Sequence, residues 1–196
     1  MELYIANARV SFANGLYKAS AFEAGQEEKY GADFIITDTT QVYEVKPDGT
    51  KVKTTLKAAE LAVANDAWKG KGTTVLEDLE ASKKAYRNGN KRKNKNGEVY
   101  EGYEGNWYIT AKNKTRPTLL DAQRQPVTEE DGTIYSGCYV NVRLSLYANT
   151  KPATKGVFAG LKGVQFAGHG DAFGGGGAAR ADEFDVVEGA TADDIA

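Results

Sequence analysis

Hydrophobic and polar positions alternate most clearly in two segments of the C-terminal half of the chain. In residues 137–148 every second residue from Cys138 to Leu146 is apolar, and in residues 106–114 the apolar positions Trp107, Ile109 and Ala111 follow the same rule. A period of two residues is typical of a β-strand with one buried face. The pattern therefore predicts two strands, each with a core face and a solvent face.

Shorter patterns predict more strands in the first third of the chain and one near its end. The expected strands are 8–12, 30–37, 41–45, 51–54 and 163–167. Pro47-Asp48-Gly49 has the residue types of a tight turn and predicts a hairpin between the segments 41–45 and 51–54. Twenty-two glycines and twenty aromatic residues against four prolines agree with a chain that is mainly β.

Two helices are expected between the hairpin and the first alternating segment. From Leu56 to Trp68 the apolar residues recur at steps of three and four, and Gly70 follows as a stop signal. Thr74 and Glu77 have the spacing of a capping box, which predicts a second helix that ends at Gly89. The fold expected from the pattern is thus a mainly β domain with one or two inserted helices.

The composition excludes several kinds of chemistry. One histidine, His169, and one cysteine, Cys138, cannot form a Cys/His zinc site, a disulfide framework or a Ser-His-Asp site. No glycine run has the GxGxxG or GxxxxGK[ST] spacing, and no acidic cluster has the spacing of nuclease metal ligands. We therefore expect no cofactor, no metal and no enzymatic activity. The absence of a long apolar run and of a signal-peptide pattern predicts a cytoplasmic protein with no membrane contact.

The net charge of −2 divides unequally along the chain. Residues 181–196 hold six acidic residues and no basic one, which leaves 25 basic and 21 acidic residues, a net charge of +4, in residues 1–180. The acidic segment contains Phe184 and Ile195 among its charges, as short docking motifs do, although plain solubilising disorder is the usual meaning of such a segment. The predicted partner-binding residues of this tail are Asp182, Glu183, Phe184, Asp185, Asp193 and Asp194.

The predicted solvent faces of the two alternating strands combine aromatic rings with cations. One face presents Tyr139, Arg143 and Tyr147, and the other presents Tyr108, Lys112 and Lys114, with Arg116 just beyond and Trp107 as the alternative ring if the register is shifted by one residue. Single-stranded nucleic acid requires this combination, because its phosphates bind cations and its unstacked bases lie on flat rings. An ordinary solvated sheet face remains the alternative interpretation.

A strongly basic segment precedes the first alternating strand. Residues 83–95 contain seven basic residues and no acidic one, and Lys91, Arg92 and Lys93 stand at its centre. We interpret residues 88–98 as a mobile loop that follows the phosphates. A solvated loop is the alternative, since Glu98, Glu101 and Glu104 come directly afterwards.

Several stretches of the chain resemble the single-stranded DNA-binding proteins of tailed bacteriophages, an OB-fold family. The resemblance rests on EGNWYITAKNKTRPTLLD, YSGCYVNVRLSLYAN and KGVFAGLKGVQF, on the glycine-rich segment, and on looser echoes at ARVSF and KYGADFII. It implies an OB-fold-like Greek-key barrel in residues 1–173, followed by a glycine-rich linker and a disordered acidic tail in residues 174–196. It also implies that the tail contacts replication or recombination proteins, such as a polymerase, a helicase or a primase.

The function predicted from residues and resemblance together is non-enzymatic. The protein would coat single-stranded DNA without sequence preference in phage replication, recombination and repair, inside the bacterial host. The rival from another class is a structural phage protein, a tail or capsid component whose sheet faces pack against further copies of itself. The division of charge along the chain favours the first interpretation, because assembly requires neither a basic body nor an acidic tail.

Overall fold

The structure is a computed structural model that describes residues 1–21, 25 and 27–174. Nine strands of this part of the chain form one sheet. In chain order the elements are β1 (Glu2–Ser11), α1 (Asn14–Tyr17), β2 (Tyr30–Ile36), β3 (Gln41–Val45), β4 (Lys51–Thr54), α2 (Leu56–Ala67), α3 (Gly72–Asp78), β5 (Tyr86–Asn88), β6 (Trp107–Asn113), β7 (Thr118–Leu120), β8 (Tyr139–Asn149) and β9 (Gly156–Gly168). Short 3₁₀ turns lie at Ala81–Lys83, Gly89–Lys91 and Pro152–Thr154. The mainly β prediction is confirmed.

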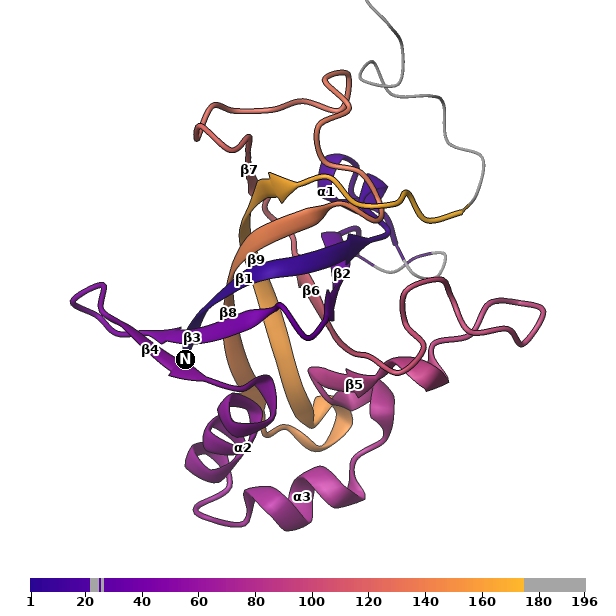
Figure 1. Ribbon diagram of the computed structural model, residues 1–196. Coiled ribbons are helices and arrows are strands. Elements are labelled where there is room, and N and C mark those ends of the chain that lie inside the picture. Colours follow the sequence, from indigo (N-terminus) through magenta and orange to yellow (C-terminus); the bar gives the residue numbers. More distant parts are fainter. Residues whose placement is uncertain (22–24, 26, 175–196) are drawn as a thin grey trace, which may run out of the picture.

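Five of the strands close into a barrel (Figure 1). β1 pairs antiparallel with β2, and β2 pairs antiparallel with β6. β6 pairs parallel with β9, which pairs antiparallel with β8, and β8 returns antiparallel to β1. One parallel contact in a closed ring of five strands is the connectivity of an OB-fold, with β1, β2, β6, β8 and β9 as its first to fifth strands. The OB-fold prediction is confirmed.

The barrel core follows from alternation along these strands. In β8 the residues Val140, Val142, Leu144 and Leu146 are buried, and the residues between them are half-buried or exposed. They meet Leu3, Ile5 and Val10 of β1, Phe34 of β2, Ile109 of β6 and Leu161 of β9 in one cluster. Cys138 belongs to the same cluster, and burial raises the pKa of its thiol to about 11, as expected for a small apolar core residue.

A long insertion separates the second and third barrel strands. It contains the β3–β4 hairpin, α2, α3, β5 and the segment 89–106, and Figure 1 shows α2 and α3 beside one end of the barrel. Thr55 caps α2 by accepting a hydrogen bond from the Ala58 N–H. The buried Glu60 of α2 accepts hydrogen bonds from the N–H groups of Ala85 (2.7 Å) and Tyr86 (3.0 Å). A side chain of α2 therefore fixes the start of β5.

Some element boundaries differ from the prediction. The second helix is only Gly72–Asp78, and Tyr86, predicted to lie in that helix, lies in β5 and pairs with Ile109. Sheet pairing thus overrides the local helical pattern here. The short helix α1 was not predicted, and the last strand begins at Gly156 rather than Gly163. Its glycines interrupted the apolar pattern on which the prediction rested.

Candidate nucleic-acid interface

A groove of about 740 Å³ runs across the outer faces of β6, β9 and β8. We call it the main groove. Five of its lining residues are cationic, two are aromatic and none is acidic: Lys29, Ser82, Lys83, Ala85, Arg87, Thr110, Lys112, Asn113, Lys114, Ser145, Tyr147, Phe158, Ala159 and Gly160. The lining thus joins the two residue types that single-stranded nucleic acid requires.

Small residues of the neighbouring strands flank Lys112 at the main groove. Gly31 pairs with Lys112, Lys112 with Gly160, and Gly160 with Ser145. A Cβ atom on Gly160 would lie 2.9 Å from the Ser145 hydroxyl oxygen, and one on Gly31 would lie 2.7 Å from Cγ of Lys112. Two glycines and a serine therefore keep the sheet surface low between its cationic and aromatic walls.

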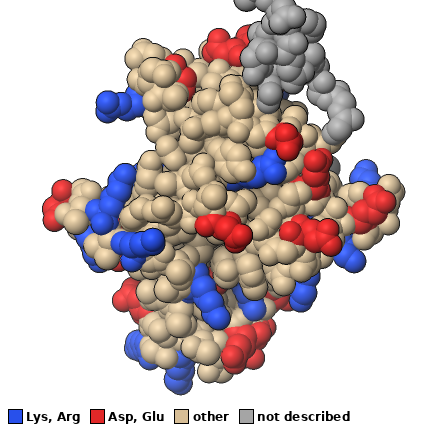
Figure 2. All heavy atoms as spheres, in the orientation of Figure 1, with Lys and Arg blue, Asp and Glu red and all other residues tan. Residues whose placement is uncertain are grey.

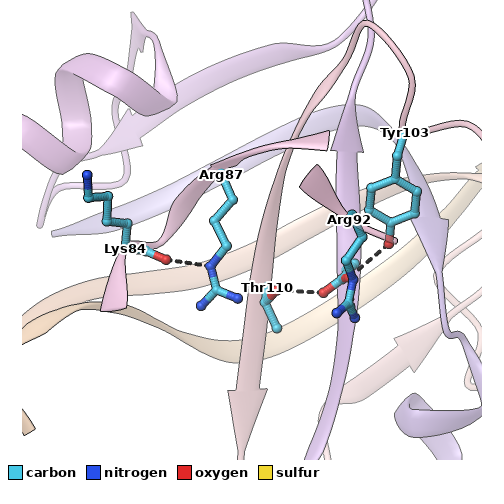
Figure 3. A network of polar contacts seen from close by, with 6 residues as sticks. Lys84, Arg87, Arg92, Tyr103 and Thr110 are labelled. Carbon is cyan, nitrogen blue, oxygen red and sulfur yellow. Dashed lines mark hydrogen bonds and ion pairs between the residues drawn. The ribbon is translucent and has the colours of Figure 1, made fainter. Parts of the chain in front are cut away.

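The cations of the groove are held by the fold. Arg87 donates from Nε to the Lys84 carbonyl oxygen (2.7 Å) and from an Nη atom to the Ser82 carbonyl oxygen (3.0 Å), the first of which is drawn in Figure 3. Carbonyl oxygens carry no net charge, so the fixed guanidinium keeps its positive charge. Burial lowers the pKa of the Lys112 ammonium group; the Asp33 carboxylate opposes this shift, and the neighbouring cations, such as Arg87, add to it.

One carboxylate reduces this field at the edge of the groove. Glu27 forms an ion pair with Lys114 and lies 3.9 Å from the Lys29 ammonium nitrogen. Both lysines are largely exposed, where such pairs contribute little to stability. Figure 2 shows basic and acidic side chains interspersed over the face seen there, whereas no acidic residue lines the main groove.

The aromatic end of the main groove lies on the β8–β9 pair. Tyr147 is 49% exposed and pairs directly with Phe158, and the two ring centroids lie 6.1 Å apart. Because Leu146 and Ala148 point to the other side of β8, Tyr147 presents its ring outward. These two rings offer a surface on which bases could lie beside the groove cations.

A second hollow, of about 410 Å³, adjoins the main groove through the shared lining residues Ser82 and Arg87. We call it the side groove. Its rings are Tyr86 and Trp107, which stack with centroids 4.4 Å apart and an interplanar angle of 13°. Lys84, Lys91, Arg92 and Lys93 also line it. Trp107 is 41% exposed, so part of the stacked pair is accessible from solvent.

Arg92 is tied to a buried carboxylate rather than directed only at solvent. Asp33 of β2, 2% exposed, accepts hydrogen bonds from Arg92 Nε (3.1 Å), the Tyr103 hydroxyl (2.8 Å) and the Thr110 hydroxyl (2.6 Å), which converge in Figure 3. Burial raises the pKa of Tyr103 far above its ordinary value, so its hydroxyl remains a donor. Residues 88–98 were predicted to form a mobile loop, but Arg92 within them is anchored to β2 by this network.

The prediction that Tyr108 presents an exposed ring is wrong. Tyr108 is 5% exposed and packs with Ile35 and Tyr103 beneath the segment 89–106. Its ring lies edge-on to the Tyr103 ring at 5.0 Å. The alternation of β6 is correct, but the inserted segment covers this part of the outer face, and Trp107 is the exposed ring instead.

The remaining predicted residues do not share one surface. Lys112, Lys114 and Tyr147 line the main groove, whereas Lys91, Arg92, Lys93, Trp107 and the buried Tyr108 line the side groove. Arg143 lies in a different hollow beside Tyr4, and Tyr139 packs near Arg9, whose guanidinium carbon is 5.6 Å from the ring centroid. Arg116 is exposed in the turn after β6. The predicted tail residues Asp182 to Asp194 lie outside the described part of the chain.

Three cationic or aromatic residues of the two grooves were not singled out as site residues from the sequence. Lys29 precedes β2, Phe158 lies in the part of β9 that was not predicted, and Tyr86 was assigned to a helix. For Phe158 the signal was present, because Val157, Ala159 and Leu161 alternate with Phe158 and Gly160 as buried and less buried positions. Extending the strand to Gly156 would have placed Phe158 beside Tyr147.

No helix in residues 1–21 and 27–174 has the length and apolar character needed to cross a membrane. The same residues contain no group of three or more His, Cys, Asp or Glu side chains placed to hold a metal ion.

An OB barrel has a fold that is common among oligonucleotide-binding proteins, and here a groove of cations and rings crosses its third, fifth and fourth strands, with Lys29 just before the second strand. Comparison with known proteins agrees with this class. The family model described as "Enterobacter phage Enc34, ssDNA-binding protein" matches residues 1–196, and the chain belongs to that family. The resemblance to phage single-stranded DNA-binding proteins that the sequence indicated is therefore confirmed.

The individual relatives are phage proteins. Putative protein p50 of Acyrthosiphon pisum secondary endosymbiont phage 1 is 33% identical over 198 residues, which cover 100% of this chain and 98% of the relative. The single-stranded DNA-binding protein from bacteriophage Enc34 in complex with ssDNA has the same fold, with a TM-score of 0.62 and 20% identity over 88% of this chain and 89% of that one. Its C-terminal truncation gives a TM-score of 0.60 over 88% of both chains at 20% identity.

Proposed function

We propose that this protein binds single-stranded DNA without strong sequence preference and coats it during phage DNA replication, recombination and repair in the bacterial host cytoplasm. The observation that carries the proposal is the main groove, whose lining joins five cations and two rings without an acidic residue. It includes the third barrel strand, β6, and Lys29 of the loop between the first and second strands, and both regions belong to the surface that OB-folds use for oligonucleotides. Membership of the phage single-stranded DNA-binding family supports the same function.

In the proposed mode of binding, phosphates and bases contact different walls of the grooves. Lys112 and Arg87 contact phosphates near the centre, and Lys29, Lys83 and Lys114 extend this contact along the groove. Bases stack on Tyr147 and Phe158 at one end and on the Tyr86–Trp107 pair at the other. Every base has a flat face, so stacking on these rings does not select a sequence.

We further propose that residues 1–173 form the DNA-binding domain, and that residues 174–196 are a glycine-rich linker and an acidic tail that recruits replication proteins such as a polymerase, a helicase or a primase. The composition of the last sixteen residues, six acidic and none basic, supports this division. Binding and recruitment need no bond to be broken, so the proposed role is not enzymatic.

The experiment that tests the proposal is a binding titration with single-stranded DNA, duplex DNA and RNA of one sequence at several salt concentrations. Single-stranded DNA should bind most tightly, with a log-log salt slope of about −0.7 for each phosphate that is neutralised. Equal affinity for duplex and single strand, or affinity that ignores salt, would contradict the proposal. Large assemblies that do not bind oligonucleotide would favour the structural phage component instead.

A truncation tests the tail separately. A chain that ends at Arg180 should bind single-stranded DNA more tightly than the full chain at low salt, because six negative charges no longer compete with phosphates for the cations. The difference should shrink as salt rises, and recruitment of replication proteins should be lost. Unchanged low-salt affinity would limit the tail to docking or solubility.

A further inference from the structure

A further surface with cations and rings, distinct from the side groove, lies beside the main groove. It is a row of residues paired across four neighbouring strands, in the order Lys53 of β4, Tyr43 of β3, Tyr4 of β1 and Arg143 of β8. Paired residues of neighbouring strands point to the same side of a sheet. We call this row and its neighbours Lys51, Arg124 and Lys162 the hairpin surface.

Contacts within the row bring its rings and charges together. The ring centroids of Tyr4 and Tyr43 lie 6.4 Å apart, and the Lys51 ammonium nitrogen lies 3.5 Å from the Tyr4 ring centroid. Tyr4 and Arg143 also line a hollow of about 330 Å³ with Arg124 and Lys162. In Figure 2 basic side chains gather at the left, over the β3–β4 hairpin.

The hairpin surface continues the main groove across β8. Ser145 lines the main groove, and Arg143 lines the hollow of about 330 Å³ beside Tyr4. Both are outward residues of β8 and are separated by two positions. Residues two apart on a strand share a face and lie about 7 Å from each other. A strand that leaves the main groove over Ser145 therefore reaches Arg143 and Tyr4 without crossing an edge of the sheet.

One acidic residue marks the crossing between the two surfaces. Glu2 pairs with Ser145 in the sheet, and its carboxylate lies 2.7 Å from the Lys162 ammonium nitrogen and 3.9 Å from an Arg143 Nη atom. Glu44 is similarly paired with Lys46 on the hairpin. Five cations of the surface thus outnumber the two nearby carboxylates, and the surface remains positive.

We propose that the hairpin surface is a second binding track for the single-stranded nucleic acid that fills the main groove, so that a long strand wraps from the groove onto the β3–β4 hairpin. The proposal rests on the proposed function. The row spans three strand intervals, about 14 Å, and places two rings between a lysine and an arginine. A nucleic acid strand carries stacked bases beside its phosphates and matches that order, whereas an acidic peptide offers no regular series of rings.

Oligonucleotide length separates the track from the main groove. We would compare a short oligothymidine of about 6 nucleotides with one of about 20, since one OB-fold covers roughly 4 to 16 nucleotides. The test variant is Lys51→Gln with Lys53→Gln, both exposed, and the matched control is Lys57→Gln with Lys69→Gln, two exposed lysines that line neither groove. The test variant should bind the long oligonucleotide several-fold more weakly and the short one normally. The control should bind both normally.

A substitution of opposite effect strengthens the test. Glu2→Gln removes the carboxylate at the crossing, so it should tighten binding of the long oligonucleotide and leave the short one unchanged. If the wild type binds both oligonucleotides and the variants bind the long one with wild-type affinity, the second track is excluded and the main groove is the only binding track of the proposal. If the wild type binds neither length, the proposed function itself fails.

The alternative occupant is an acidic peptide, and a peptide of residues 181–196 serves as its probe. The second track requires the Lys51→Gln, Lys53→Gln variant to lose affinity for the long oligonucleotide. A variant that loses affinity for the peptide but binds long oligonucleotides like the wild type would overturn the proposal and assign the surface to acidic protein segments.

Discussion

The outer faces of β2 and β6 are open to solvent in one half and buried in the other. Around Lys112, which pairs with Gly31, the surface is open and lines the main groove. Around Ile35 and Tyr108, four residues away along each strand, it is buried beneath the segment 89–106. The same two strands therefore supply a binding surface at one end and a second small core at the other.

Asp33 lies between these halves and explains why the cover is needed. A carboxylate on the oligonucleotide face of an OB-fold would repel phosphate, but Arg92 and two hydroxyl groups satisfy this one. The inserted segment thus removes a negative charge from the binding face and brings Lys91 and Lys93 to its border. The comparison shows that the alternation along a strand is not enough to predict which residues can bind DNA, because an inserted segment can cover part of the outward face.

The largest expected effect comes from removing the carboxylate that holds the covered half. Asp33→Ala leaves the hydroxyl groups of Tyr103 and Thr110 without their acceptor, at a cost of about 1 to 3 kcal/mol each. The Arg92 guanidinium, whose side chain is 36% exposed, also loses its partner and adds less because water reaches it, so the expected total is about 3 to 5 kcal/mol. Urea unfolding should show a fall of that size in the free energy of unfolding. Lys114→Ala, which breaks the exposed pair with Glu27, is the control and should change stability by less than about 1 kcal/mol.

Replacing the buried Tyr108 and the exposed Tyr147 by alanine, one at a time, tests the comparison between the covered and the open surface directly. Tyr108→Ala creates a cavity in the covered half and should lower the free energy of unfolding by about 3 kcal/mol. Tyr147→Ala should leave stability nearly unchanged and weaken single-stranded DNA binding by roughly 1 to 3 kcal/mol, the value of one stacked base. Thermal melts and anisotropy titrations of both variants decide it. A Tyr147→Ala protein that melts early and binds normally would invert the assignment.

The sequence predicted the fold better than it predicted the site, for a physical reason. The period of two in β8 gives the burial of Val142 and Leu144 directly, because the barrel core covers one face of the strand along its whole length. The exposure of Tyr108 depends on Tyr103, which folds back from the insertion and hydrogen-bonds to Asp33. No pattern within β6 contains that contact.

The division of the predicted platform has a similar origin. Arg143 and Tyr147 share the outward face of β8, as the alternation predicts, yet they line different hollows. The register of β8 against β9 shifts between Arg143 and Leu144, where Lys162 is the extra residue of β9. A bulge of this kind bends the strand, and local sequence periodicity does not reveal it.

A smaller effect concerns the charge of the open half. Lys112→Gln removes one phosphate contact, so the log-log salt slope of single-stranded DNA binding should become shallower by about 0.7. Titrations of both proteins from low to moderate salt give the slopes. Lys57→Gln, an exposed lysine at the start of α2, is the matched control and should keep the wild-type slope. An unchanged slope in Lys112→Gln would place the phosphates outside the main groove.

The smallest effect concerns Glu60, which fixes the strand that separates the two grooves. Burial raises the pKa of this carboxyl above its ordinary value, against the opposing hydrogen bonds from Tyr86 and Ala85. Between the unfolded and folded pKa values the folded protein binds more protons than the unfolded one, so the stabilisation is present at low pH and is lost as pH rises through the folded pKa.

Glu60→Gln keeps an oxygen acceptor for the N–H groups of Ala85 and Tyr86 but cannot ionise. The stability of the wild type relative to this variant should therefore decline from acidic to neutral pH, measured by urea unfolding of both proteins at matched pH values. If the relative stability of the wild type instead rises with pH, the two backbone hydrogen bonds outweigh burial. The ionised carboxylate would then be the form that holds Ala85, which lines the main groove, and Tyr86, which lines the side groove.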